Sequence, residues 1–357
     1  MHAPVRIPYI DTVKGVAILL MIFGHMRFHN LNWFVYSFHM PLFFILSGFF
    51  FNPQKPIVKR IMKLIFPYII TAMAILSVEV IFQVLNYFLT NEAFSTIKII
   101  RIIAASVCGC VKPVGIGNYL IPDVGPIWFL LALALGYLIL WILYRMEMKY
   151  RIGAMTVIGC VTLAILGWVI SMFRGQIPFS INQALIVPLF LCVGGEIRRF
   201  MTQNKVNTIL LMLSVIVWSI QLYIQKHVQF MSMGQMGSIL YPIYVIGAIL
   251  ASYIIILIFK YLNSKFKFRI LNKLGTATLV ILCVHTIDLF GIEPRLRCIL
   301  SNIGLDKGEL YIYGYKILLY ASLLFYIFNK RRNGVHTIFR NLKRNLLALM
   351  LVILPSR

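Results

Sequence analysis

The chain has 357 residues, of which 61% are hydrophobic and 12% charged, and its mean hydropathy is +0.88. A soluble domain is about 45–50% apolar and about 25% charged, so the composition excludes a cytosolic enzyme, a disordered protein and a disulfide-stapled secreted module. The 34 Lys and Arg residues outnumber the 10 Asp and Glu residues, for a net charge of +24. Because the basic residues gather between long apolar runs, they indicate anionic headgroups and membrane topology, and we predict no nucleic-acid partner.

Ten apolar segments follow one another along the chain, each close to the roughly 20 residues that a helix needs to cross a bilayer. They are 12–28, 33–51, 64–89, 126–144, 153–172, 180–197, 206–225, 237–259, 275–292 and 309–328. Lipid offers the backbone no hydrogen-bond partner, so a spanning segment of this kind is expected to be helical. We therefore predict an all-α integral membrane protein with about ten transmembrane helices.

The distribution of Lys and Arg between the apolar segments predicts how the chain crosses the membrane. With the N-terminus in the cytoplasm, about 23 of these residues fall on the cytoplasmic side and about 9 on the other, a positive-inside bias. The basic connections on the cytoplasmic side are 55–63, 145–151, 198–205, 260–273 and 330–357. We therefore predict a multi-pass protein of the cell (inner or plasma) membrane with both termini in the cytoplasm.

Two further segments do not have the length or pattern of a span. Residues 90–125 form a long connection, whose IKIIRIIAAS stretch is expected to lie along the membrane interface. Residues 345–357 are apolar but too short to cross, and they predict an amphipathic helix on the inner leaflet. We expect one membrane-embedded domain over 1–344, followed by this tail. The six cysteines are scattered and predict neither a disulfide framework nor a metal site.

Ionisable groups at membrane depth are costly and are candidates for function by default. Those in the apolar segments are Lys14, His25, His39, Glu79, His285, Asp288 and Lys316. Lys14 and His25 are eleven residues apart, about three helical turns, which predicts one shared face and a separation of about 16 Å. Asp11 lies one turn before Lys14 and is placed to pair with its ammonium. The pattern suits a long anionic substrate, although a snorkelling lysine and a packed histidine would also produce it.

The second histidine, His39, opens the next apolar segment. His25 and His39 lie about equally far from the expected turn near 30–32, so antiparallel helices would place both imidazoles at a similar depth. Pro41 follows His39 and is expected to open the helix towards a cavity. His39 is then a base, an orienting partner or a substrate ligand, unless it only caps the helix.

His285 and Asp288 are three residues apart in the ninth apolar segment and can pair on one helical face. Such a pair either fixes the imidazole tautomer for chemistry or holds helices together. Glu79 and Lys316 are isolated charges whose partners the sequence does not identify, and we expect them to be packing groups.

The cytoplasmic connection 55–68 places basic side chains at the mouth of the third apolar segment. Arg60 and Lys63 are three residues apart and face one way. They would grip phosphate groups, by forked hydrogen bonds from Arg and by point charge from Lys. The same cluster would also serve as a topogenic signal without any ligand.

Five motifs together resemble the acyltransferase-3 superfamily of integral membrane acyltransferases. They are YIDTVKGVAILLMIFGH (9–25), SFHMPLFFILSGFFF (37–51), KRIMKLIFPY (59–68), GPIWFLLAL (125–133) and, more weakly, GTATLVILCVH (275–285). The chain looks most like the fucose 4-O-acetylase-like branch, the surface polysaccharide O-acetyltransferases. The likeness runs through the segments in order and covers nearly the whole chain.

The resemblance assigns roles to the candidate residues. Lys14 and His25 match the family's basic residue and histidine eleven positions apart, and Arg60 and Lys63 match its basic pair, with Lys where many members carry Arg. Ala277 departs from the family's usual polar residue in the ninth segment. The assignment is therefore His25 and His39 as catalytic residues, Lys14, Arg60, Lys63 and Asp11 as donor-binding residues, and Trp128, His285 and Asp288 as supporting or acceptor-site residues.

The function that the resemblance implies is transfer of an acetyl or similar short acyl group from acetyl-CoA to a sugar hydroxyl. The acceptor would be a surface polysaccharide, such as a capsule or exopolysaccharide, or its lipid-linked precursor. In this reading neutral His25 is the general base and His39 or Trp128 stabilises the oxyanion. Acetyl-CoA is a co-substrate, and we predict no permanently bound cofactor and no metal. The oligomeric state is not predicted.

Two rival functions remain open at this point. A transporter or flippase of lipid-linked sugar would use the intramembrane His, Asp and Glu residues as a proton path. The segments contain no convincing internal duplication of the kind that many transporters show. A sensory or ligand-binding membrane domain is the other rival, and the retained Lys14 and His25 speak against it.

Overall fold

A computed structural model describes residues 7–25, 31–91, 93–117, 119–203, 207–302 and 308–329. The chain divides into two compact units, Met1–Arg295 and Leu296–Arg357. Within the described residues all regular structure is helical apart from one two-stranded sheet, which confirms the predicted all-α class. The expected domain boundary at 344/345 and the tail 345–357 lie outside the described residues, and so does most of the predicted cytoplasmic C-terminus.

The first unit holds most of the elements. They are α1 (Pro8–His25), α2 (Asn32–Tyr36), α3 (His39–Gly48), α4 (Ile57–Thr90), α5 (Thr96–Cys108), β1 (Val114–Ile116), β2 (Tyr119–Ile121), the 3₁₀ turn η2 (Gly125–Ile127), α6 (Trp128–Tyr150), α7 (Met155–Arg174), the 3₁₀ turn η3 (Pro178–Ser180), α8 (Ile181–Thr202), α9 (Thr208–His227), α10 (Tyr241–Lys265), α11 (Arg269–Thr276), α12 (Thr278–Ile287) and the π-helical turn η4 (Asp288–Ile292). Helix α13 (Glu293–Asn302) begins in this unit, and α14 (Gly308–Asn329) belongs to the second.

Seven helices of the described residues are long and apolar enough to cross a membrane. They are Ile57–Phe88, Gly125–Tyr150, Met155–Arg174, Pro178–Thr202, Thr208–His227, Tyr241–Lys265 and Glu309–Asn329. An eighth is added if Arg269–Thr276 and Thr278–Ser301, which are bent by 69° to one another, cross as one span. A multi-pass membrane protein is therefore supported, whereas the count of ten and the orientation stay predictions.

The first two expected spans are helical, but neither is among the helices of the described residues that are long and apolar enough to cross a membrane. Helix α1 carries Asp11 and Lys14, and the second segment is divided into α2 and the ten-residue α3. The division falls at Ser37 and Phe38, just before His39, because Pro41 has no N–H to donate to the Ser37 carbonyl. Pro41 therefore opens the backbone ahead of His39, where we had expected the opening beyond it.

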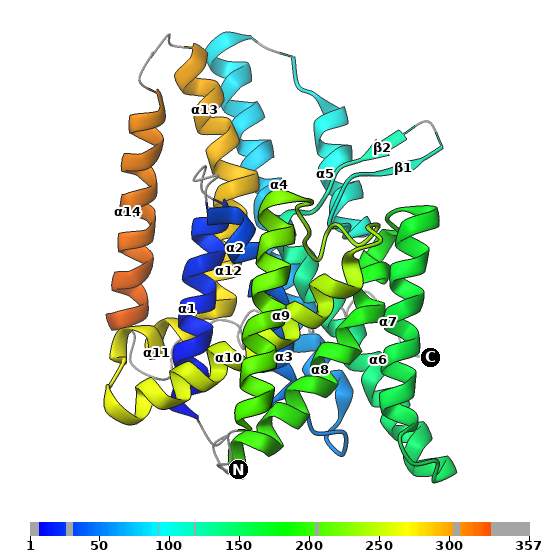
Figure 1. The fold of residues 1–357 in the computed structure, drawn as a ribbon. Coiled ribbons are helices and arrows are strands. Elements are labelled where there is room, and N and C mark those ends of the chain that lie inside the picture. The colour runs from blue at the N-terminus through cyan, green and yellow to red at the C-terminus, as the bar shows by residue number, and fades with distance from the viewer. Residues whose placement is uncertain are drawn as a thin grey trace. The chain divides into compact units, whose positions relative to one another are not determined.

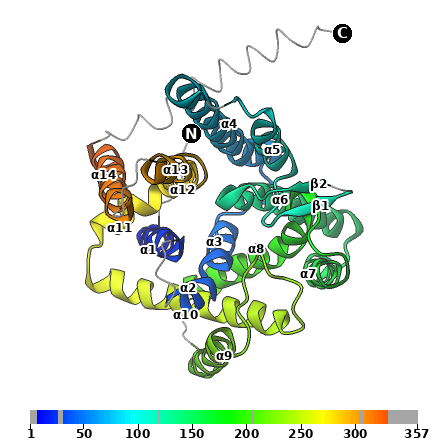
Figure 2. The same ribbon diagram turned by 90° about the horizontal axis from the view of Figure 1, so that it is seen from above.

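Helices α1 and α3 lie in the middle of the first unit, with α4, α6, α8 and α10 around them in the view of Figure 2. Helix α1 packs against α3, α10, α11 and α12, and α3 packs against α8 and α10. Figure 1 shows α1 running from the lower part of the view up to α2, with the β1–β2 hairpin at the same upper end. The predicted interfacial stretch is helix α5, whose Ile97, Ile100 and Ile103 are exposed.

Candidate functional site

A cavity of about 570 Å³ lies among α1, α3, α4, α6 and α12 of the first unit. Four residues of α1 line it at helical spacing: Lys14, Ile18, Met21 and His25. Lys14 and His25 therefore share one face, as their spacing predicts, and the cavity follows α1 for about 16 Å between them. A cavity of this length has room for an extended substrate with its charged part at Lys14.

Three histidines gather near the C-terminal end of α1. The ring centres of His25 and His285 are 5.2 Å apart, and His25 lies 6.1 Å from the ring of Tyr36. The Tyr36 ring is in turn 4.9 Å from that of His39. His25, Tyr36 and His39 line the cavity, whereas His285 is buried and is not among the lining residues. The structure thus brings together the histidines of α1, α3 and α12.

The backbone sets the tautomer of two of these histidines. Nδ1 of His25 lies 2.8 Å from the Met21 carbonyl oxygen, and Nδ1 of His39 lies 3.0 Å from that of Val35. A carbonyl oxygen only accepts, so Nδ1 carries the proton in both rings. In the neutral imidazole this leaves the basic lone pair on Nε2. In its neutral form each ring therefore offers Nε2 as a hydrogen-bond acceptor.

Three cations surround the segment that follows α3. Arg60 Nη2 donates to the Phe50 carbonyl at 2.6 Å, and the guanidinium lies over the Tyr137 ring at 4.7 Å. Lys14 Nζ lies 4.9 Å from the centre of the Phe50 ring. Arg198 of α8 donates to the Phe49 carbonyl at 2.7 Å. We call Lys14, Arg60 and Arg198 the basic cluster, and Lys14 is the member that lines the cavity.

Arg198 is a site residue that the sequence reasoning missed. It was counted only as one of the basic residues that set topology. Its contact with Phe49 joins positions 149 residues apart, and no local spacing predicts such a contact. The only signal available was an Arg at the end of a predicted span, a position that topology alone already explains.

The structure also places the remaining predicted residues, Trp128, Asp11, Asp288 and Lys63. Trp128 is nearly buried and lines the cavity, and Asp11 is the charged neighbour of Lys14. Asp288 is fully buried at the first residue of η4, one turn beyond His285. Lys63 is exposed on α4 and is not among the residues that line the cavity, although Arg60, one turn earlier, reaches the basic cluster.

A second polar group lines the cavity outside the helices. It consists of Lys112, Asp123, Ser232 and Gln235, from the connections before α6 and α10, and we call it the polar rim. Asp123 Oδ1 accepts from the Gly125 amide at 3.0 Å, and partial burial raises the pKa of this carboxyl. The sequence reasoning also missed this group, because its members come from separate connections.

The described part of the chain contains no cluster of His, Cys, Asp or Glu side chains arranged to hold a metal ion. The residues that line the cavity combine Lys14 of the basic cluster, several aromatic and imidazole rings and the polar rim. These features suit a polyanionic substrate at one position and a hydroxyl compound at another.

Comparison with known proteins gives one match. The family model Acyl_transf_3, described as an acyltransferase domain, matches residues 7–305. Every residue of the basic cluster and the polar rim lies within the matched range, and so do the three histidines His25, His39 and His285. No curated protein and no solved structure matches the chain.

Proposed function

The chain belongs to the acyltransferase-3 family, a premise from which we propose that this membrane acyltransferase moves an acetyl or similar short acyl group from acetyl-CoA to a sugar hydroxyl. The acceptor in this proposal is a surface polysaccharide, such as a capsule or exopolysaccharide, or its lipid-linked precursor. The observation that carries the proposal is that Lys14 and His25 line the same cavity.

The basic cluster is the proposed site for the phosphates of CoA. Arg offers planar forked donors that match phosphate oxygens, and Lys adds a compact charge. The carbonyls of Phe49 and Phe50 already orient Arg198 and Arg60. From Lys14 the pantetheine arm would extend along the cavity, so that the thioester carbonyl reaches His25. Lys63 was assigned to this site from the sequence, and its exposed position supports a role in attracting the donor more than one in holding it.

Acyl transfer at His25 needs one proton to move twice. Nε2 of His25 takes the proton of the acceptor hydroxyl as its oxygen attacks the thioester carbon, and a tetrahedral oxyanion forms. The C–S bond then breaks, the acyl group stays on the acceptor oxygen, and the CoA thiolate takes the proton from His25. General-base catalysis of this kind contributes about 10²–10⁴-fold in rate.

The oxyanion needs a donor, and the tautomers help to choose it. Neutral His39 with its proton on Nδ1 presents a lone pair at Nε2. It is therefore better suited to accept a hydrogen bond from the acceptor sugar than to stabilise an anion. Trp128 lines the cavity and its indole N–H is a donor only, so we assign the oxyanion to Trp128.

Two observations concern the acceptor and the rival function. The polar rim supplies hydroxyl, amide, carboxyl and ammonium groups, which match the hydroxyls of a sugar. Glu79, one of the acids that a proton-driven transporter would use, is ion-paired with Arg295. This ion pair gives Glu79 a structural partner, so it supports the expected packing role of Glu79 and not a place on a proton path.

The donor site is tested by titrating acetyl-CoA into the purified full chain in detergent. We expect saturable binding that Arg60→Gln and Arg198→Gln each weaken by about 10–100-fold, because a hydrogen bond to a charged group contributes about 1.5–3 kcal/mol. The matched control is Arg199→Gln, since Arg199 neighbours Arg198 but is exposed and paired with Glu196. Absence of acyl-CoA binding, or equal binding by all three variants, would contradict the proposed site.

A further inference from the structure

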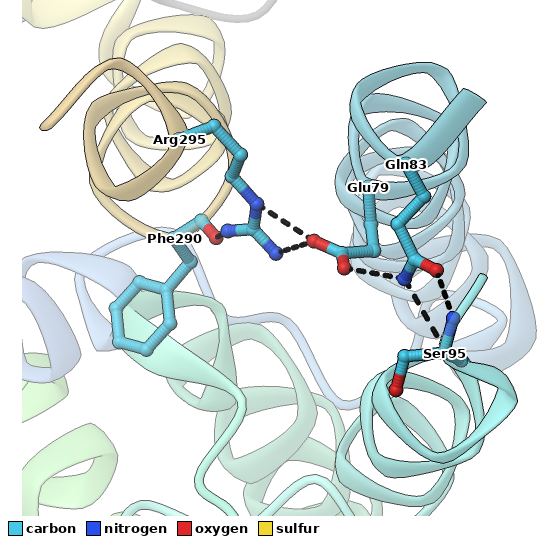
Figure 3. Close-up of polar contacts among 5 residues, drawn as sticks. All are labelled: Glu79, Gln83, Ser95, Phe290 and Arg295. Carbon is cyan, nitrogen blue, oxygen red and sulfur yellow. Dashed lines mark hydrogen bonds and ion pairs between the residues drawn. The ribbon is translucent and has the colours of Figure 1, made fainter. Parts of the chain in front are cut away.

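A buried ion pair lies next to the cavity but contains none of the groups assigned to the reaction. Glu79 belongs to α4 and is 2% exposed, and Arg295 belongs to the first turn of α13. Arg295 Nε donates to Glu79 Oε2 at 2.8 Å, and Nη2 contacts the same oxygen, as Figure 3 shows. A carboxylate within a membrane-spanning helix is costly unless it is paired, so each residue keeps the other in place.

A glutamine fixes the other oxygen of the carboxylate. Gln83, one turn after Glu79, donates from Nε2 to Glu79 Oε1 at 2.6 Å. The Ser95 backbone N–H, just before α5, donates to Gln83 Oε1 at 2.7 Å (Figure 3). Both carboxylate oxygens are therefore engaged, one by Gln83 and the other by Arg295.

Arg295 also completes the backbone of the π-helical turn η4. In a regular helix the Phe290 carbonyl would accept from the N–H of residue 294, but residue 294 is proline and has none. Arg295 Nη1 donates to the Phe290 carbonyl instead (Figure 3). One guanidinium thus links Glu79 to a turn that proline has opened. π-Helical turns within helices are frequent at functional sites.

The turn that Arg295 holds forms part of the cavity wall. Leu289 and Phe290 line the cavity, and the Phe290 ring is pressed against Gly125, where a Cβ atom would come within 2.5 Å of the ring. Gly125 has a φ of +69° and opens the turn that leads into Trp128. His285, whose ring contacts that of His25, lies in the last turn of α12 just before η4.

We infer that Glu79 and Arg295 are positioning residues for acyl transfer: their ion pair holds η4, so that Phe290 closes the cavity beside Trp128 and His285 keeps its contact with His25. The inference rests on the proposed function. The ion pair acts on the geometry of the transfer step and not on donor binding, because the basic cluster contacts neither the pair nor η4.

The test uses purified full-length protein and two variants of the pair. Arg295→Lys keeps a charge opposite Glu79 but cannot bridge both that carboxylate and the Phe290 carbonyl. The double variant Glu79→Gln with Arg295→Gln removes both charges, so that neither is left buried alone. We expect both variants to lower kcat for acyl transfer by about 10–100-fold, since a misplacement of about 1 Å at a reacting centre costs about 10²-fold. Their Kd for acetyl-CoA should stay at the wild-type value.

The matched control is Arg297→Gln, on the same helix, where Arg297 is paired with the half-exposed Glu309. This variant should keep the wild-type kcat. Hydrogen exchange of the amides of 288–292 provides a readout that needs no activity, and it should accelerate in the two pair variants only. Wild-type kcat or unchanged exchange in the pair variants would overturn the inference. Wild-type protein without any acyl transfer would instead overturn the proposed function, and the exchange measurement would still test whether the pair holds the turn.

Discussion

Replacing His25 by alanine should reduce the kcat of acyl transfer by about 10²–10⁴-fold, the contribution expected of a general base. The physical reason is that Nδ1 of His25 is tied to the Met21 carbonyl, which leaves Nε2 as the basic atom in the cavity. Alanine removes that atom without touching the basic cluster. The measurement is release of CoA thiol by the purified protein in the presence of a sugar acceptor, with acetyl-CoA binding recorded in parallel.

His227 provides the matched control for this substitution. It is exposed at the end of α9 and is not among the residues that line the cavity, and its ring contacts that of Tyr223. His227→Ala should therefore transfer acyl groups at the wild-type rate. Transfer by His25→Ala at or near the wild-type rate would remove His25 from the mechanism.

Replacing Gly194 by alanine, which adds a single methyl group, should lower the stability of the folded protein markedly. Helices α3 and α8 meet backbone to backbone there: a Cβ atom on Gly194 would come within 2.0 Å of the Ile45 carbonyl oxygen, and one on Gly48 within 2.1 Å of that of Leu191. Small residues allow such close approach of membrane helices. Overpacking typically costs about 1–3 kcal/mol, and a backbone oxygen has no rotamer with which to move aside, so Gly194→Ala should fall at the upper end of this range.

The neighbouring glycine is the control. A Cβ atom on Gly195 would meet nothing within 4 Å. Because Ala is about 0.5–1 kcal/mol better than Gly in a helix, Gly195→Ala should melt in detergent at or slightly above the wild-type temperature. Gly194→Ala should melt several degrees lower, by an effect of about 4–8 °C per kcal/mol for a small domain and less for a larger one. Equal melting temperatures would show that α3 and α8 do not pack as described.

Local sequence patterns predicted the parts of the site that lie on one helix. The eleven-residue interval between Lys14 and His25 predicted their shared face, because helical periodicity depends only on spacing. The position of Pro41 correctly indicated an irregular backbone near His39, although the opening lies before that residue. The composition predicted a multi-pass helical membrane protein, and seven or eight helices meet that description in the described residues.

Contacts between segments that are distant along the chain could not be predicted from the sequence. Arg198 reaches Phe49 and Glu79 reaches Arg295 across 149 and 216 positions, and neither contact follows from periodicity. Glu79 was expected to be a packing group without an identified partner, and its partner proved to be an Arg of the connection after the ninth segment. The polar rim combines several connections and likewise required the folded chain.

Acyl transfer across a sealed membrane tests the proposed function most directly. Full-length protein is reconstituted into vesicles, labelled acetyl-CoA is supplied on one side only, and a sugar acceptor is trapped on the other. Lys14 near the start of α1, His25 at its end and the polar rim all line one cavity, so we expect label to appear on the trapped acceptor and free CoA thiol to remain on the donor side. Thiol release with no labelled acceptor on the opposite side, or no thiol release with any acyl-CoA, would contradict the account.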